Sequence, residues 1–530
     1  MSAMQQHSNP LVAGLLARRA FPDAPSSVEL VETHISYIFL TGKYVYKVRK
    51  AVDFGFLDFS TLEKRLRDCQ REVELNRRLS PEVYLGVVEV RKEGDRYSVE
   101  GPGDTVEYAV RMRQLPRERA MSELLRRGEF TGDMVRRVAR RIAAFHREAE
   151  GGERIARLSG YPAVRQNIME NFSQTECYIG RTIPLEEYLE LKAYSAAFLE
   201  ARRPLLEERA RQGWMRDCHG DLHSAQIFME DGIHIIDCIE FNERLRYCDT
   251  AADIAFLAMD LDYHHRRDLS RALIEAYQEE MKDPGLAHLL DFYKVYRAYV
   301  RGKVAGFRLD MPDLAEKDRE EVSEEAGRYF RLARSYLRPM SSPTLFVVMG
   351  LTGTGKTQLA TSLARLWELT HISTDRVRKA LAGIPAAEHR YTDYDSDIYS
   401  PGFTRKTYKE MHREAEGLLA QRKSAVLDGT YKDASFREEA FSVARRAGAS
   451  VVPLLCVLPQ NVARERLERR MREPGAVSDG RWEVYLRQRE EFQPLQEEHL
   501  VVDTSGTADE SLFRALKKIY GLGLKEEDIG

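Results

Sequence analysis

The chain has 530 residues, of which 43% are apolar and 31% charged, and its net charge at pH 7 is −3. This length exceeds what one hydrophobic core supports, so several domains are expected in an ordinary soluble globular protein. The nearly balanced charge provides no global attraction for nucleic acid or an anionic membrane, and neither is expected as a main partner. No apolar run is long enough to span a bilayer, and the first residues do not resemble a signal peptide, which favours a cytoplasmic location.

After an N-terminal segment, 1–27, the region 28–116 has the pattern of a small sheet carrying one helix. Alternating and β-branched segments predict strands on both sides of one charged helix, at 28–31, 35–40, 44–48, 83–90, 97–100 and 108–115, with the helix near 61–79. Lys47 lies inside the third strand, where a lysine is either solvated or directed at an anion. On the helix, Glu72 points inward more than Glu74, because it shares a face with Cys69 and Asn76.

The following region, 117–334, is mostly helical and contains two polar segments close together. One is His219-Gly220-Asp221, and the other is Asp237 at the end of an apolar run. A phosphotransferase requires one carboxylate that deprotonates a hydroxyl and another that holds magnesium between phosphates. Two alternatives remain open here: a zinc helix through His219 and His223, although the Glu of H-E-x-x-H is missing, and a purely structural polar loop.

These residues carry a resemblance to a known family. Across about 28–300 the sequence resembles the aminoglycoside phosphotransferase-like branch of the protein-kinase-like fold, in the segments 45–48, 219–223 and 235–237. The resemblance implies two lobes, 28–116 and 117–334. It further implies that Lys47 contacts ATP phosphates and pairs with Glu72, that Asp221 is the catalytic base, and that Asp237 binds magnesium.

The same resemblance has two departures. Gln226 stands where the family pattern expects an asparagine that binds magnesium, so the amide oxygen lies one methylene farther out. Residues 33–36 occupy the place of a glycine-rich phosphate loop and contain no glycine.

The resemblance also implies a loop-shaping role for His219 and a hinge beside the adenine at 111–116. An active kinase and a ligand-binding pseudokinase both remain open for this region.

A linker is expected at 335–343, and the strongest pattern of the chain follows it in the region 344–530. An apolar strand ends in Gly-x-x-x-x-Gly-Lys-Thr, and helical spacing follows the motif. The glycines Gly350, Gly353 and Gly355 let backbone N–H groups surround phosphates, while Lys356 adds a mobile positive charge. Thr357 is the expected magnesium ligand. The sequence therefore predicts a site for ATP with Mg²⁺.

Further along this region, Asp375 opens a helix, where it either caps the helix or orients a substrate hydroxyl. Asp428 ends a buried strand, in a position suited to a magnesium-water ligand. The helix 461–472 has five arginines, of which Arg466 and Arg470 are the candidates for closing over ATP. The region 344–510 resembles small P-loop kinases of the polynucleotide-kinase and gluconate-kinase kind, which implies that Asp375 is the general base and Arg378 contacts a substrate anion.

Together these patterns predict a multidomain protein of α/β and α+β class, in which a two-lobed protein-kinase-like fold precedes a P-loop domain with a parallel sheet. This order resembles a bacterial fusion described as a predicted bifunctional kinase. We expect ATP-dependent transfer to hydroxyl groups of small polar metabolites at both sites. The alternatives are a P-loop kinase regulated by a pseudokinase domain and a nucleic-acid 5′-hydroxyl kinase. The acceptors and the oligomeric state do not follow from the sequence.

Overall fold

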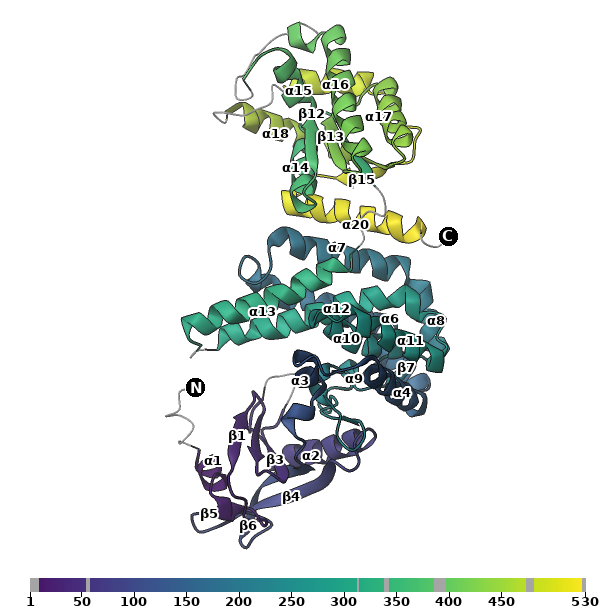
Figure 1. Cartoon of the computed structure of the whole chain (residues 1–530). Helices are drawn as coiled ribbons and strands as arrows, with labels where there is room; N and C mark the ends of the chain where they lie inside the picture. The colour runs from purple at the N-terminus through teal and green to yellow at the C-terminus, as the bar shows by residue number, and fades with distance from the viewer. Residues whose placement is uncertain are drawn as a thin grey trace. The chain divides into compact units, whose positions relative to one another are not determined.

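The computed structural model describes residues 9–53, 58–311, 314–337, 343–385, 397–472 and 481–526. The chain forms two compact units, one comprising residues 1–182 and 202–336 and the other comprising 183–201 and 337–530. None of the described helices is long and apolar enough to cross a membrane. The expected fold class is confirmed: a sheet-and-helix lobe and a helical lobe form the first unit, and a parallel α/β domain forms most of the second (Figure 1).

The small lobe of the first unit is an antiparallel six-stranded sheet with the order β1-β2-β3-β6-β4-β5. Both faces of the sheet are packed: residues near the N-terminus, Leu15 and Phe21, cover one face, and Cys69 and Val73 of the following helix cover the other. The helix α2 packs against β4 and β6, and Thr61 caps its first turn. The elements are α1 Pro10–Leu15, β1 Glu29–Glu32, β2 Ser36–Leu40, β3 Tyr44–Arg49, α2 Leu62–Arg77, β4 Tyr84–Glu93, β5 Arg96–Val99 and β6 Asp104–Arg113.

The helical lobe surrounds α10, which is buried along nearly its whole length. Its sequence is largely apolar, and its three aspartates, Asp253, Asp260 and Asp262, are buried with the rest of the helix. Two short ribbons, β7–β10 and β8–β9, lie beside the helices. The elements are α3 Met121–Arg126, α4 Gly132–Glu148, α5 Glu153–Ser159, α6 Tyr161–Thr175, α8 Arg203–Arg211, β7 Met215–Asp217, β8 Ile227–Phe228, β9 His234–Ile235, α9 Glu243–Arg246, β10 Tyr247–Asp249, α10 Thr250–Tyr263, α11 Arg267–Met281, α12 Leu286–Phe307 and α13 Glu316–Ser335. Short 3-10 turns connect several elements, at Arg18–Ala20, Arg117–Arg119, Glu176–Tyr178, Ser224–Gln226 and Arg308–Asp310.

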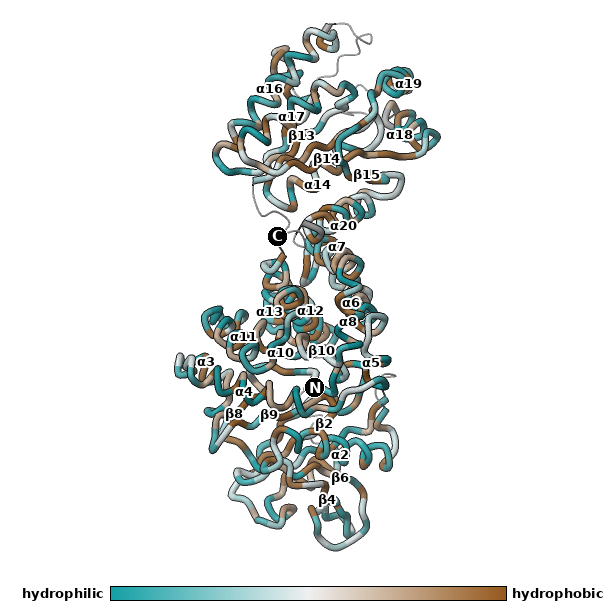
Figure 2. The backbone as a smooth tube through the Cα atoms, turned by 90° about the vertical axis from the view of Figure 1, so that its right-hand side faces the viewer, coloured by the Kyte–Doolittle hydropathy of each residue, from teal (hydrophilic) through white to brown (hydrophobic). Residues whose placement is uncertain are grey.

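The second unit is built on a five-stranded parallel sheet with the order β12-β13-β11-β14-β15. The strand β11 is buried on both faces, and the sheet interior is hydrophobic (Figure 2). Leu345, Val347 and Met349 face α16 and α17, whereas Phe346 packs against Trp367 on the other face. The elements are β11 Thr344–Met349, α14 Lys356–Leu366, β12 Thr370–Ser373, α15 Thr374–Leu381, a 3-10 turn Asp397–Tyr399, α16 Pro401–Ala420, β13 Ala425–Gly429, α17 Ala434–Arg446, β14 Ser450–Val457, α18 Gln460–Arg472, α19 Trp482–Glu491, β15 Leu500–Asp503 and α20 Ala508–Glu526.

The helix α7, Leu185–Ala201, belongs to the second unit although the sequence places it between two segments of the first. The sequence analysis assigned these residues to the helical lobe, and the structure corrects that assignment. The helix packs along α20, and its buried Glu190 accepts hydrogen bonds from Tyr520 Oη at 2.8 Å and Trp367 Nε1 at 2.6 Å. Because α7 is apolar on most sides, it needs a partner on two faces, and α20 supplies one of them.

Candidate functional sites

In the first unit, the strand lysine lies between two carboxylates. Lys47 Nζ on β3 is 2.8 Å from Glu72 Oε1 on α2 and 2.8 Å from Asp237 Oδ1. Burial disfavours the ammonium, but the two carboxylates outweigh burial and raise the pKa of Lys47 above its ordinary value. Lys47 in turn lowers the pKa of Asp237. The structure thus brings Asp237 to the pair of Lys47 and Glu72 that the resemblance implies.

A second cation, which sequence reasoning missed, stands beside this trio. Arg49 follows Lys47 by two positions on β3, so both side chains lie on the same face of the strand. Its buried guanidinium contacts Glu72 Oε2 at 2.8 Å, Asp68 Oδ2 at 2.6 Å and a carboxylate oxygen of Glu240. Burial raises the pKa of Glu240 to about 7. The two cations therefore meet four carboxylates, and burial raises the pKa of two of them, Asp68 and Glu240.

Asp237 is fixed by its backbone rather than by a long strand. It has φ +63° two residues after the short strand β9, and its N–H donates to Tyr84 Oη at 3.0 Å. The next N–H, of Cys238, donates to Asn76 Oδ1 on α2 at 2.8 Å. These bonds leave the Asp237 side chain 45% exposed. Gln226 approaches it with its amide nitrogen, which donates to Asp237 Oδ2 at 3.2 Å; a half-turn of the amide would present Oε1 to a cation there.

The loop that carries Asp221 is shaped by a neutral histidine. His219 is fully buried; its Nε2–H donates to the Ile236 carbonyl at 2.9 Å, and its Nδ1 accepts from the Asp221 N–H at 3.3 Å. Burial lowers the pKa of His219, which favours this neutral tautomer. Both ring nitrogens are used and the segment is not helical, so the zinc-helix alternative is wrong. The loop-shaping role expected of His219 agrees with these bonds.

A buried carboxylate anchors the same loop from below. Asp253 on α10 accepts the N–H of His219 at 3.0 Å and the N–H of Gly220 at 2.9 Å, and it contacts His146 Nε2 at 3.1 Å. Burial raises the pKa of this carboxyl, but the hydrogen bond with His146 and the charge of Arg297 prevail, and the pKa falls to about 2. Sequence reasoning missed Asp253. A detectable signal existed, because an acid inside an otherwise apolar helix is rarely buried unless it is paired.

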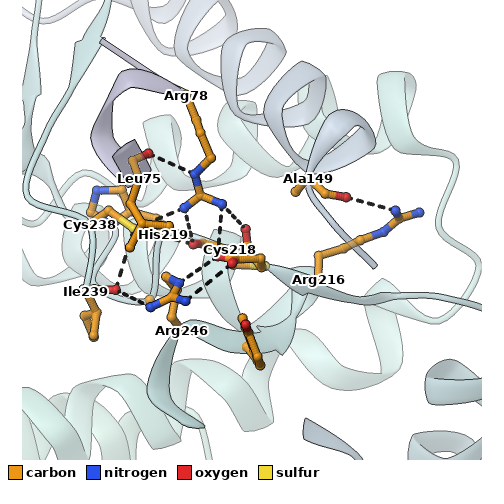
Figure 3. Close-up of polar contacts among 12 residues, drawn as sticks. Leu75, Arg78, Ala149, Arg216, Cys218, His219, Cys238, Ile239 and Arg246 are labelled. Atoms are coloured by element: carbon orange, nitrogen blue, oxygen red, sulfur yellow. Dashed lines mark hydrogen bonds and ion pairs between the residues drawn. The ribbon is translucent and has the colours of Figure 1, made fainter. Parts of the chain in front are cut away.

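Two arginines tie this loop to the segment after Asp237 (Figure 3). Arg78 Nη1 donates to the Asp217 carbonyl at 2.8 Å and Oδ1 at 2.9 Å, and Nη2 donates to the Cys218 carbonyl at 3.2 Å. Arg246 Nε donates to Asp217 Oδ1 at 2.7 Å, and its Nη1 donates to the Ile239 carbonyl at 3.0 Å. The two loops that present Asp221 and Asp237 are therefore held in one hydrogen-bonded framework.

The side chain of Asp221 itself remains accessible, at 36% exposed. Its Oδ2 lies 3.4 Å from His223 Nε2. Burial would raise the pKa of this carboxyl, but His223 lowers it well below the ordinary value. Asp221 is thus an ionised carboxylate on a rigid loop, available to accept a proton from a bound hydroxyl.

In the second unit, the glycine motif forms a tight loop between β11 and α14. Gly350, Gly353 and Gly355 have φ of +149°, +79° and +77°. A Cβ on Gly350 would lie 2.7 Å from the Cys456 carbonyl oxygen, and one on Gly353 would lie 2.9 Å from Leu467 Cγ. Only glycine satisfies both the backbone angles and the space. Lys356 and Thr357 begin α14, so the loop meets the positive end of the helix dipole.

Residues from distant parts of the second unit hold this loop. Gln488 Oε1 on α19 accepts the Thr352 N–H at 2.9 Å, and Thr504 Oγ1 after β15 donates to the Thr354 carbonyl at 2.7 Å. Arg466 Nη2 donates to the carbonyls of Ser505 and Gly506, and its Nη1 lies 3.6 Å from the position of a Cβ on Gly355. Arg466 therefore lies beside the loop, and its predicted role over ATP stays a prediction; the side chain of Arg470 lies outside the described residues.

The carboxyl edge of the sheet brings an acid next to the glycine loop. In the ladder, Asp428 on β13 pairs with Val348 on one side and Ser373 on the other, so it lies where β11 enters the loop. Asp428 is 2% exposed; its Oδ2 is 3.4 Å from His371 Nε2, and its buried Oδ1 has no hydrogen-bond partner. Such an unsatisfied buried carboxylate oxygen fits a ligand to magnesium or its water.

Asp375 and Arg378 lie on the first turns of α15, beyond the same edge. Ser373 caps the helix by accepting the Arg376 N–H, so the capping role considered for Asp375 is wrong. The Asp375 Oδ1 is 3.6 Å from Arg378 Nη1. Arg378 is 8% exposed, stacks 4.8 Å from the centre of the Tyr399 ring, and leaves its Nε without a hydrogen-bond partner. The pair thus combines an exposed carboxylate with a buried guanidinium whose Nε has no hydrogen-bond partner.

Comparison with known proteins gives a family match in the second unit and a relative that covers most of the chain. A family model described as an AAA domain matches residues 345–495. The uncharacterized protein Rv2004c of Mycobacterium tuberculosis (strain ATCC 25618 / H37Rv) is 31% identical over 458 residues, which cover 86% of this chain and 88% of that protein. The chain belongs to the same family as Rv2004c. The match extends over the kinase-like unit and into the P-loop domain, so the members of this family share the fusion.

Solved structures similar to this Rv2004c-family protein fall into two groups. A choline/ethanolamine kinase family protein from Mesorhizobium loti is 12% identical and covers 61% of this chain and 99% of its own, with a TM-score of 0.37. A gluconokinase from Sinorhizobium meliloti 1021 is 20% identical and covers 36% of this chain and 95% of its own, with a TM-score of 0.24.

Proposed function

We propose that the chain is an ATP- and magnesium-dependent phosphotransferase with two separate active sites, each of which transfers the γ-phosphoryl group to a hydroxyl of a small polar metabolite. The observation that carries the proposal for the first unit is Lys47 between Glu72 and Asp237, with an accessible ionised Asp221 on the neighbouring loop. For the second unit, the support comes from the glycine loop of Lys356 and the unsatisfied carboxylate of Asp428 at the same sheet edge.

In the first site, Lys47 would bind ATP phosphates while Asp221 receives the proton of the acceptor hydroxyl. The acceptor oxygen then bonds to the γ-phosphorus, and the bond between that phosphorus and the β,γ-bridging oxygen breaks to release ADP. Asp237, with Gln226 after a half-turn of its amide, would hold magnesium. The metal supplies neutralisation of the phosphate charge when bound.

In the second site, the loop N–H groups and Lys356 would surround the phosphates, and Thr357 with Asp428 would hold magnesium. Asp375 is the proposed base, and Arg378 the proposed contact for an anionic part of the substrate. Arg466 would neutralise phosphate charge from the side of α18. Magnesium again supplies charge neutralisation at the phosphates.

Two lysine variants of the full chain test this proposal. With radiolabelled ATP and a bacterial metabolite extract, Lys47→Ala and Lys356→Ala should each remove a different labelled product. Arg445→Ala, in the last turn of α17, provides a matched control because it removes a surface cation from the second unit. An unchanged product pattern in Lys47→Ala would contradict catalysis by the first unit.

One observation favours a second candidate function, in which the first unit binds ATP without turnover and regulates the P-loop kinase. Gln226 donates to Asp237 and so competes with a metal for that carboxylate. In this case Lys47→Ala would remove no product of its own and would change the rate of the product that depends on Lys356. The same two variants therefore separate the two candidates.

A further inference from the structure

An arginine of the helical lobe faces the catalytic loop without a partner carboxylate. Arg297 on α12 donates its Nη1 to the carbonyl of Gly220, the residue before Asp221, at 2.9 Å. Arg301 lies one helical turn farther along α12, so its side chain projects from the same face of the helix. This spacing directs Arg301 toward the loop that carries Asp221 and His223.

The guanidinium of Arg301 is held by aromatic rings rather than by acids. Its central carbon lies 5.5 Å from the centre of the Tyr329 ring on α13, and that ring stacks on Tyr263 of α10 at 3.9 Å. The Arg301 Nε is buried and has no hydrogen-bond partner. Among the described residues no carboxylate lies within ion-pair distance of Arg301. A positioned guanidinium with a buried, unpartnered Nε and no carboxylate at ion-pair distance is suited to an anion that arrives with a ligand.

Electrostatics connect this cation to the proposed base. The positive charges of His223 and then of Arg301 oppose the effect of burial on Asp221 and hold the pKa of that carboxyl below its ordinary value. The neighbouring acid Asp260 is already used, because its Oδ2 accepts the Ser224 N–H at 2.8 Å. Arg301 stands on α12 with α10 and α13, whereas Lys47 and Asp237 mark the phosphate side of Asp221.

We propose that Arg301 binds an anionic group, a carboxylate or a phosphate, on the acceptor whose hydroxyl reaches Asp221. The proposal rests on the proposed function of the first unit and defines its substrate class as hydroxylated anions. An ammonium group in the same place would meet a fixed positive charge in a partly desolvated site, and it would be rejected. The aromatic stack adds rigidity, because it restricts the rotamers of Arg301 before the ligand binds.

The charge of the acceptor can be measured before its identity is known. A bacterial metabolite extract is separated at pH 7 into a fraction retained on an anion exchanger, one retained on a cation exchanger and one retained on neither. Each fraction is incubated with radiolabelled ATP and the full chain carrying Lys356→Ala, which silences the second site. A labelled product that is absent when the chain also carries Asp221→Asn identifies an acceptor of the first site. Phosphatase treatment of the anionic fraction before the assay separates phosphate from carboxylate acceptors.

We expect the Asp221-dependent label in the anionic fraction. Arg301→Gln should raise the KM for that fraction about 10- to 100-fold, as for loss of a charge-assisted bond, and leave the KM for ATP unchanged. Arg301→Lys should retain part of the affinity, and Arg308→Gln, which removes an exposed arginine paired with Glu325, should change neither KM. Acceptor activity in the cationic or neutral fraction would overturn the proposal, as would a raised KM for ATP alone. Absence of Asp221-dependent label in every fraction would instead refute catalysis by the first unit, and with it the proposal.

Discussion

Asp253 anchors the catalytic loop through hydrogen bonds from two backbone amides, and the strength of these bonds can be measured directly. Asp253→Asn keeps the size of the side chain but replaces one acceptor oxygen with an NH₂ group. One of the two N–H donors, His219 or Gly220, then faces another donor, and the remaining bond loses its charge. Charge-assisted bonds contribute about 1.5–3 kcal/mol and neutral ones about 1, so we expect a loss of about 3 kcal/mol in the stability of the loop.

Hydrogen exchange measures this loss at the amides concerned. A decrease of about 3 kcal/mol in opening free energy corresponds to more than about 100-fold faster exchange of the His219 and Gly220 amides. The product that depends on Lys47 should fall, and the product that depends on Lys356 should persist. Unchanged exchange at both amides in a folded Asp253→Asn protein would refute the anchoring role.

Asp268→Asn is the matched control for this experiment. Asp268 also has a pKa lowered to about 2, in its case mainly by a hydrogen bond from Arg266, but its side chain is 64% exposed. Solvent screens such a pair, so the substitution should alter stability by no more than about 0.5 kcal/mol. A similar effect of both variants would mean that the lowered pKa, rather than burial under the loop, determines the result.

Three further variants test other parts of the structure. Glu240→Gln should remove a pH dependence of the stability. The folded-state pKa of Glu240, about 7, lies above the unfolded value near 4.3, so the free energy of unfolding falls as pH rises through 7, by at most about 1.4 kcal/mol per pH unit. Urea unfolding at pH 6 and pH 8 should show this decrease in the wild type and not in the variant. Gly353→Ala should weaken ATP binding and lower the melting temperature of the second unit, because the new Cβ would lie 2.9 Å from Leu467 and the backbone at this position is left-handed. Gly417→Ala, at a helical position with open space around it, is the control in calorimetry. Glu190→Ala removes the carboxylate that accepts hydrogen bonds from Trp367 Nε1 and Tyr520 Oη, and it should destabilise the second unit by about 2–4 kcal/mol. Thermal unfolding followed by Trp367 fluorescence measures this loss. An unchanged transition would contradict the role of this carboxylate.

Local patterns gave most of the elements that present the candidate sites. The strands around Lys47 were expected at 35–40 and 44–48 and occur at Ser36–Leu40 and Tyr44–Arg49. The inward face of Glu72 followed from helical periodicity, which depends only on neighbours within a few turns. The glycine loop was equally readable, since its motif and its flanking strand and helix are continuous in sequence.

Long-range partners did not follow from the sequence. Arg49 and Glu240 form an ion pair although they lie far apart in the sequence. His371 contacts Asp428 only because β12 and β13 are neighbours in the sheet. Periodicity gives the face on which a side chain lies but does not identify the element that covers that face. For the same reason the position of α7 in the sequence predicts the helical lobe, although this helix packs along α20 in the second unit.

Because α7 packs in the second unit, the chain cannot be divided at the linker into two fragments that each contain a whole unit. A recombinant fragment that begins at residue 344 would lack α7 and expose the side of α20 that bears Tyr520, which forms a T-shaped ring contact with Tyr194. Conversely, a protease site introduced at 338–342 would cut the backbone without releasing the C-terminal fragment, because the N-terminal fragment would still contribute α7 to the second unit. The two polypeptides should then copurify, as complementary fragments of one folded domain do. In this chain the connection between the two halves therefore depends on α7 as well as on the linker.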